Sequence, residues 1–228
     1  YDIPKSLEGY YQETGRAGRD GGEGQCITFY NNKDLQKLEK FLEGKPLAEQ
    51  YIGRQLLHET TAYAESSVCR RKLLLHYFGE SYDVENCGNC DNCLNPKKQV
   101  EAKELLETVI EAVLALKENF KADYVIDVLL GKETADIISH NHDELECFGC
   151  GDDEDAKRWN AVIRQAMLSG YIEKEVENYG LLRVTSEGRL FLKNGGSFQI
   201  MEDNEFDAYE DNASGGTSVL DEELLVML

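Results

Sequence analysis

The run CRRKLLLHYFGESYDVENCGNCDNC, residues 69–93, carries four cysteines with the spacing Cys69-x17-Cys87-x2-Cys90-x2-Cys93. Three cysteines within seven residues lie too close together to pair sensibly with one another as disulfides. Zinc binds four thiolates in a tetrahedron, at about 2.3 Å from each sulfur, and such a site leaves no position open for water. The pattern therefore predicts one structural zinc ion per chain, with unliganded core cysteines as the alternative.

Helical periodicity precedes the cysteine run. Leucines recur at helical spacing from Asp34, and two further helices are predicted over residues 47–64 and 67–78. Before them, Gln25–Tyr30 is a short apolar run bounded by Gly24 and two asparagines, which predicts a strand. Together with the glycine-rich segment before it, this strand resembles the edge of a RecA-like α/β lobe.

A second unit is predicted after the cysteine run. Helical spacing returns near Ala102, and two strands, Tyr171–Val176 and Leu181–Thr185, follow around an Asn-Tyr-Gly turn. Helices followed by a β-hairpin describe a winged helix, which is a variant of the helix-turn-helix. The further helices expected in this unit cover Asp123–Leu130, Thr134–Ser139 and Ala156–Ser169.

The formal charge of −20 argues, taken whole, against a nucleic-acid partner, because phosphate binding depends on Lys and Arg. The charge is unevenly spread, however: residues 1–98 sum to −2, residues 99–200 to −9 and residues 201–228 to −9. The acidic excess therefore lies mainly away from the cysteine run. Residues 201–218 lose periodicity and are expected to form an acidic linker, with binding of protein partners as a weaker idea.

No stretch approaches the roughly 20 apolar residues that span a bilayer, and the N-terminus lacks the layout of a signal peptide. We therefore expect a soluble, cytoplasmic protein with no membrane partner. The chain opens without Met and ends in what looks like the start of a helix, so a piece of a longer protein is expected. The expected fold is α+β and mainly helical, with units at 1–33, 34–98, 99–200, 201–218 and 219–228.

A decapeptide near the N-terminus, QETGRAGRDG at residues 12–21, carries two arginines three residues apart. Arg16 and Arg19 would lie on one side of a helical turn, and such a pair suits a polyphosphate. An arginine aimed at the γ-phosphate contributes on the order of 10³–10⁵ in rate in nucleotide hydrolases. For the bare pattern, a glycine-rich turn with surface arginines is the alternative.

These features together resemble the RecQ family of superfamily 2 helicases. Residues 10–21 resemble motif VI, and the cysteine run resembles the zinc-binding subdomain of that family, in which four cysteines hold one zinc ion. The last ten residues resemble the first helix of the helicase-and-RNase-D C-terminal domain. The resemblance implies that Arg19 is the arginine finger and that Gln12 and Arg16 face ATP and Mg²⁺ held by an N-terminal helicase lobe.

The resemblance further implies an ATP-dependent 3′→5′ DNA helicase that acts in repair, recombination, replication and the SOS response, associated with the bacterial nucleoid. A single-stranded-DNA-binding protein is among the expected partners. The sequence contains no GxxxxGK[ST] loop, so this chain alone is expected not to hydrolyse ATP. A zinc-stabilised winged-helix module for DNA binding or docking, without motor activity, is the alternative from another class, and the paired arginines argue against it.

Duplex and forked DNA are the expected ligands of the winged helix. A helix that presents basic residues beside a β-hairpin can contact phosphates, and an aromatic residue at the hairpin tip can stack on an end base pair. A solvated basic face is the alternative for each residue. Because the hairpin is short, a strand-separating role is not expected. The candidate DNA contacts are Lys157, Arg158, Arg164, Tyr179 and Arg183, with Asn178 beside the tip.

Two other patterns lie near the helix that begins at Ala156. The acidic run at 152–155 can complement the helix dipole and would repel phosphate if it turned toward DNA. The spacing of His140, His142, Cys147 and Cys150 could nominally hold a second zinc ion. The glycines around Cys150 predict a mobile turn there, so ordinary cysteines at a tight turn are expected instead.

Overall fold

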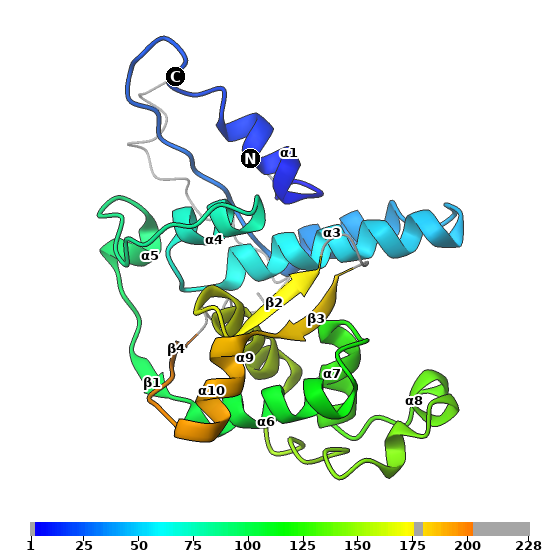
Figure 1. The fold of residues 1–228 in the computed structure, drawn as a ribbon. Helices are drawn as coiled ribbons and strands as arrows, with labels where there is room; N and C mark the ends of the chain where they lie inside the picture. Colours follow the sequence, from blue (N-terminus) through cyan, green and yellow to red (C-terminus); the bar gives the residue numbers. More distant parts are fainter. Residues whose placement is uncertain (1–2, 176–179, 203–228) are drawn as a thin grey trace, which may run out of the picture.

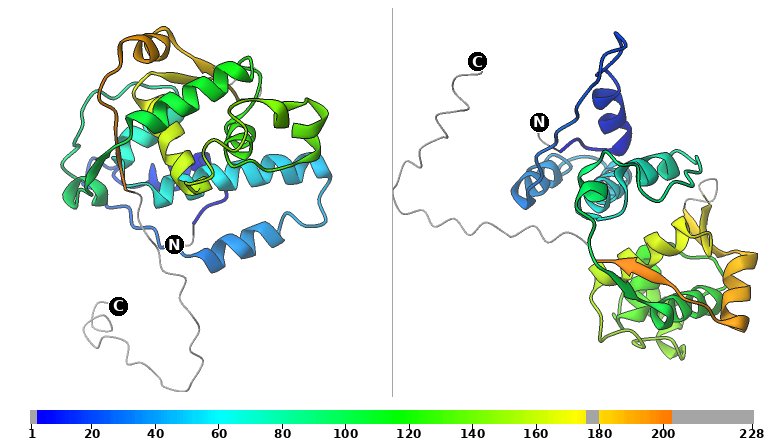
Figure 2. Two further views of the ribbon diagram at one scale, coloured as in Figure 1. Left: turned by 90° about the horizontal axis from the view of Figure 1, so that it is seen from below. Right: turned by 90° about the vertical axis from the view of Figure 1, so that its left-hand side faces the viewer.

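The computed structural model describes residues 3–175 and 180–202, which fold into two halves, one above the other in Figure 1. In the right-hand view of Figure 2 the segment after α5 joins these halves. The upper half contains α1 (Leu7–Thr14), α2 (Asn32–Lys40), α3 (Leu47–Glu65), α4 (Arg70–Tyr77) and α5 (Asp91–Leu94). The lower half contains β1 (Gln99–Glu101), α6 (Lys103–Ala115), α7 (Ala122–Leu129), α8 (Ala135–Ser139), the 3-10 helix η1 (His142–Glu144), α9 (Ala156–Leu168), β2 (Ile172–Glu175), β3 (Leu181–Val184), α10 (Ser186–Asn194) and β4 (Gln199–Met201).

The long helix α3 organises the upper half, because α1, α2 and α4 each pack against it. Ser6 caps α1 by accepting a hydrogen bond from the Gly9 backbone at 3.1 Å. Gly53 allows the turn after α2 to approach α3 closely, since a Cβ at this position would lie 2.5 Å from a methyl carbon of Leu42. We call the helices α2–α5 with their connecting loops the zinc platform.

The lower half has its own apolar core around α6, which packs against α7, α9, α10 and β3. Trp159 is the largest fully buried side chain, and it projects from α9. No residue of α1–α5 contributes to this core among the residues that the structure describes. Burial of this core stabilises the lower half largely independently of the zinc platform.

Two small antiparallel sheets complete the lower half. β2 and β3 form the hairpin of the winged helix, with Ile172 opposite Val184. β1 and β4 pair with Val100 opposite Ile200, so the strand that enters this half lies beside the strand that leaves it. The combination of helices with two short sheets confirms the expected α+β, mainly helical fold.

The predicted helices and both hairpin strands are confirmed within one to three residues, whereas the strand predicted at Gln25–Tyr30 is wrong. That segment is extended without ladder hydrogen bonds, and Ile27 and Phe29 are 59% and 70% exposed. A strand needs a neighbour to pair with, and within residues 3–175 and 180–202 no strand lies beside this segment. Five further short elements were not predicted from the sequence, namely α5, β1, η1, α10 and β4.

The turn around Cys147 and Cys150, which is predicted from the sequence to be mobile, is held by hydrogen bonds in the structure. The backbone N–H groups of Gly149 and Gly151 donate to the carbonyl oxygens of Val128 and Leu129, each at 2.9 Å. The Trp159 indole donates to the Gly151 carbonyl, also at 2.9 Å. Glycine here permits close backbone approach rather than motion.

No helix in the described part of the chain is long and apolar enough to cross a membrane. The acidic residues 203–228 and the hairpin tip with Asn178 and Tyr179 lie outside the described residues.

Substitution of Gly151 by alanine is expected to destabilise the lower half. A Cβ at this position would lie 2.4 Å from Trp159 Cζ2, and such overpacking costs about 1–3 kcal/mol. Urea unfolding followed by the fluorescence of Trp159, the single tryptophan, should show a lower midpoint. Gly9→Ala is the matched control, because its Cβ would meet its nearest neighbour at 3.6 Å, and it should leave this midpoint unchanged. Equal midpoints for both variants would contradict the packing argument.

Candidate metal centre and nucleic-acid interface

The four predicted cysteines converge, and their sulfur atoms all lie within 4.8 Å of one another. Cys69 is the residue that precedes α4, and Cys90 precedes α5. Cys93 lies within α5, where its backbone N–H donates to the Cys90 sulfur at 3.4 Å. This arrangement of four thiols fits a tetrahedral zinc ion with no open position.

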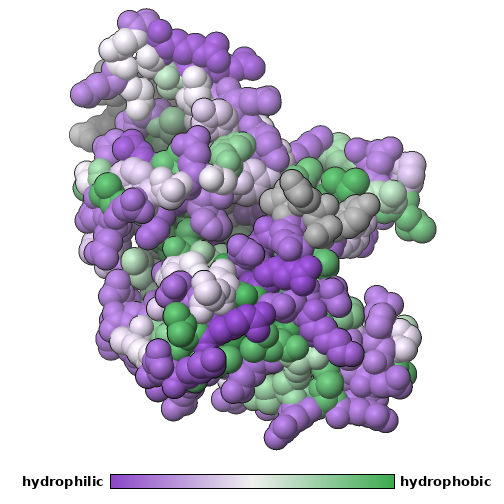
Figure 3. Space-filling view, in the orientation of Figure 1, coloured by the Kyte–Doolittle hydropathy of each residue, from purple (hydrophilic) through white to green (hydrophobic). Residues whose placement is uncertain are grey.

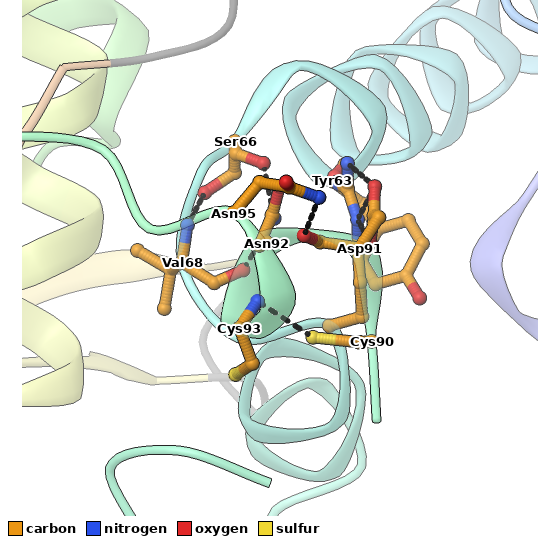
Figure 4. A network of polar contacts seen from close by, with 9 residues as sticks. Tyr63, Ser66, Val68, Cys90, Asp91, Asn92, Cys93 and Asn95 are labelled. Carbon is orange, nitrogen blue, oxygen red and sulfur yellow. Dashed lines mark hydrogen bonds and ion pairs between the residues drawn. The ribbon is translucent and has the colours of Figure 1, made fainter. Parts of the chain in front are cut away.

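Asn92 ties the two sequence segments of this centre together, as Figure 4 shows. Its buried amide Nδ2 donates to the carbonyl oxygens of Ser66 and Val68, both at 2.7 Å. The Val68 N–H in turn donates to the Ser66 hydroxyl at 3.1 Å. The loop that leads into Cys69 is therefore anchored directly to the turn between Cys90 and Cys93.

An ion pair beside the cysteines adds a second connection. Arg70 Nη2 lies 3.0 Å from Asp91 Oδ2, Arg70 Nε lies 3.1 Å from Asp91 Oδ1, and the guanidinium also donates to the Tyr63 carbonyl. Burial opposes ionisation of Asp91, but the Arg70 guanidinium holds its pKa below the usual value. Two-point pairing of this kind fixes orientation as well as distance.

The thiols of this centre differ in acidity. Burial raises the pKa of Cys69. Burial and hydrogen bonds with the neighbouring thiols raise the pKa of Cys93 to about 12. Burial also acts on Cys87, but the backbone N–H groups of Asn89 and Cys90 hold its pKa at about 6. Because a metal binds thiolates, binding must release protons from the weaker acids, and affinity for a metal rises with pH.

The residues that resemble motif VI gather at the end of α1. Gln12, Arg16 and Arg19 line one shallow depression together with Tyr11 and Gly15. Arg19 Nε donates to the Gly15 carbonyl at 3.3 Å, and both arginines are exposed. The turn thus presents two guanidinium groups on one outward surface.

At the start of α9, Lys157 and Arg158 line a second depression. Lys97, which follows the cysteine turn in the sequence Pro96-Lys97-Lys98, lies in the same depression. The sequence analysis missed Lys97, although the lysine pair directly after a metal-binding turn was a signal that could have identified it. The depression therefore combines basic residues of α9 with Lys97 from the segment that joins the two halves.

Acidic residues share this depression, namely Asp153, Glu154, Asp155 and Glu202. Asp155 caps α9, because its carboxylate accepts a hydrogen bond from the Arg158 backbone N–H at 2.7 Å. One member of the acidic run thus complements the helix dipole as expected. The others leave the depression with mixed charge.

The remaining candidate DNA contacts lie elsewhere. Arg164 is half-buried on α9. Arg183 on β3 places Nε 3.0 Å from Glu175 Oε1, and this hydrogen-bonded pair raises the pKa of Arg183. The structure does not bring either residue into the depression that contains Lys157.

His140 and His142 do not assemble with the two nearby cysteines. Their rings stack on each other at 5.4 Å and meet the Phe120 ring edge to face. His142 Nδ1 also hydrogen-bonds the Tyr124 hydroxyl at 2.7 Å. Within the described ranges, Cys69, Cys87, Cys90 and Cys93 form the one group of three or more converging metal ligands. A second zinc site is therefore not supported there.

Replacement of Asn92 by alanine is expected to loosen the cysteine centre. It leaves the Ser66 and Val68 carbonyls without this buried donor, which costs about 1–3 kcal/mol. Limited proteolysis should show faster cleavage in residues 66–93 of this variant. Asn89→Ala changes an exposed asparagine between two of the same cysteines and should leave the rate unchanged. A rate for Asn92→Ala equal to that of the parent would show that the anchor is dispensable.

Two protein-family models match the chain. The RecQ zinc-binding family matches residues 32–94, and the RQC domain family matches residues 96–208. The first match covers the four cysteines, and the second covers the winged helix. The zinc-binding match and the cluster of four thiols together support zinc as the cofactor.

Similar proteins carry helicase names. The ATP-dependent DNA helicase RecQ of Haemophilus influenzae is 37% identical over 195 residues, which are 85% of this chain and 31% of that protein. The enzyme of the same name from Pasteurella multocida is 36% identical over the same shares. The ATP-dependent helicase SGS1 of Saccharomyces cerevisiae is 35% identical over 66% of this chain and 11% of its own length. The chain thus spans about a third of the bacterial relatives. With adjacent zinc-binding and RQC matches and these relatives, the chain belongs to the RecQ family.

Proposed function

We propose that this chain is the zinc-stabilised, DNA-binding region of an ATP-dependent 3′→5′ DNA helicase that acts in repair, recombination, replication and the SOS response. The observation that carries the proposal is the convergence of four thiols in a helical platform joined directly to a winged helix. The relatives named as ATP-dependent DNA helicases support it. The proposed place of action is the cytoplasm, at the bacterial nucleoid, with a single-stranded-DNA-binding protein as a partner.

In this proposal Cys69, Cys87, Cys90 and Cys93 are the four ligands of one structural zinc ion. The fit rests on the mutual distances of the sulfur atoms and on the anchoring of both segments by Asn92. Zinc would fix the approach of α5 to the start of α4 and would supply no reaction chemistry, since four thiolates occupy every position.

The motor role is assigned to the arginines after α1. Arg19 would serve as the arginine finger toward the γ-phosphate of ATP, with Gln12 and Arg16 in the same depression. ATP and Mg²⁺ would be held by another helicase lobe of the whole protein. The exposure of both arginines supports this role, because they are accessible to a nucleotide from outside this chain.

Duplex and forked DNA would bind at the start of α9 through Lys157 and Arg158, with Lys97 as an added contact. Arg164 and Arg183 remain proposed contacts, although neither lines the depression with Lys157. Tyr179, outside the described residues, also remains a proposed contact. The acidic residues in the same depression favour a second candidate function, a zinc-stabilised docking module for proteins.

Removal of one proposed zinc ligand by Cys90→Ser is expected to abolish stoichiometric zinc. Metal analysis should find about one zinc per parent chain and far less in the variant, with a lower unfolding temperature. Cys26→Ser is the control, because Cys26 is exposed and outside the cluster. Full zinc content in the Cys90 variant would rule out the proposed ligand set.

The double change Lys157→Ala/Arg158→Ala is expected to weaken binding of forked duplex DNA. Each lost phosphate contact should reduce the slope of log K against log salt by about 0.9. Fluorescence anisotropy across a salt series measures both quantities. Lys132→Ala is the control, because Lys132 pairs with Asp127 on another surface. If folded, zinc-loaded protein fails to bind DNA at low salt, the docking module becomes the better explanation.

A further inference from the structure

The zinc platform and the winged helix meet through few, polar contacts. The Ser67 hydroxyl donates to the Glu202 carbonyl. Two lysines of the winged helix contact α3, as described below. Because no residue of α1–α5 enters the apolar core of residues 100–200 among those described, little hydrophobic burial holds the halves together. In Figure 3 the outline is notched between the projecting end of α3 and the lower half.

Lys174 of β2 contacts α3 through an ion pair. Its Nζ lies 2.6 Å from Glu59 Oε1, and the two side chains are 44% and 27% exposed. The aliphatic part of Lys174 crosses Gly180 of the hairpin, where a Cβ would lie 2.9 Å from Lys174 Cε. The ammonium group is therefore directed from the hairpin to the platform.

Lys121, at the start of α7, makes a similar contact with Tyr51. Its Nζ lies 2.7 Å from the Tyr51 hydroxyl and 4.8 Å from the ring centroid. Glu59 and Tyr51 are eight residues apart on α3, which corresponds to about 12 Å along a helix. The two lysines thus contact α3 about two turns apart.

The two lysines also lie close together on the winged helix. Lys174 pairs with Leu182 in the hairpin, and the Leu182 N–H donates to the carbonyl of Phe120, the neighbour of Lys121, at 3.0 Å. Together they present two ammonium groups on the surface beside the hairpin. The groups that meet them are a carboxylate and an aromatic ring with a hydroxyl, which resemble in chemistry the phosphates and bases of a nucleic acid.

We propose that Lys121 and Lys174 form a second phosphate-binding site for duplex DNA, which α3 occupies in this structure. DNA and the zinc platform then compete for the same two ammonium groups, and DNA binding at this site separates the hairpin from α3. The proposal rests on the proposed function, in which the winged helix binds duplex DNA, and it adds a site distinct from Lys157 and Arg158.

The test compares the whole chain with Glu59→Gln, Lys174→Gln and the charge swap Glu59→Lys/Lys174→Glu. Anisotropy with a blunt duplex at low salt measures affinity, and hydrogen exchange of residues 51–59 and 172–175 measures docking. Glu59→Gln should bind DNA about two- to fivefold more tightly, because an exposed pair contributes modestly, and should exchange faster. Lys174→Gln should also exchange faster but bind DNA more weakly. The charge swap should restore slow exchange without restoring affinity.

Glu59→Gln needs controls for two effects, namely the change beside Tyr77 and the loss of one negative charge. Burial, Glu8 and Glu59 raise the pKa of Tyr77, whose hydroxyl donates to Glu8 at 2.6 Å, so loss of Glu59 alone could affect the platform. The charge swap and Lys174→Gln separate that effect. Glu49→Gln removes the same charge from the same helix, where Glu49 faces Lys45 at 3.8 Å. It should leave DNA affinity unchanged.

Equal gains in affinity for Glu49→Gln and Glu59→Gln would overturn the proposal, since they would reflect overall charge. Unchanged affinity in Lys174→Gln, together with weakened binding in Lys157→Ala/Arg158→Ala, would overturn it while the proposed function stands. Absence of duplex binding in every folded variant, Glu59→Gln included, would remove both.

Discussion

The upper half of the molecule depends on one amide, that of Asn92, which joins the loop before Cys69 to the turn between Cys90 and Cys93. The Ser66 and Val68 carbonyl oxygens both accept hydrogen bonds from the Asn92 side chain. Buried polar groups of this kind are costly to leave without a hydrogen-bond partner. The Arg70 to Asp91 ion pair acts on the same two segments. These contacts join the two segments that carry the thiols, and they support the positions of the four sulfur atoms.

The lower half follows a different principle, because apolar burial around α6 and Trp159 determines its shape. Its basic residues lie at the edges of this core, at the start of α9 and beside the hairpin. The contrast has a functional meaning. A hydrogen-bonded platform fixes the metal centre, while a separate apolar core lets the winged helix keep its fold when its few contacts to the platform change.

Much of this architecture was accessible from residue patterns. The cysteine spacing identified the four thiols, and helical and alternating periodicity identified the long helices and the hairpin. The strand at Gln25–Tyr30 failed because an apolar run specifies a strand only when a partner is present. The short pair of β1 and β4 spans about a hundred residues of sequence, so no local signal could reveal it. Lys97 was missed for a related reason, since its place beside Lys157 depends on where the segment before β1 meets α9.

The pairing of β1 with β4 has a mechanical consequence. Gln99 lies opposite Met201, and the Glu202 N–H donates to the Lys98 carbonyl at 3.4 Å, so the chain enters and leaves the lower half at neighbouring points. Tension applied along the chain would break the hydrogen bonds between β1 and β4 one after another and would not load them all at once. The sheet would part before force reached the packed helices. Force on the two chain ends would thus open this junction while the apolar core of the lower half remained folded.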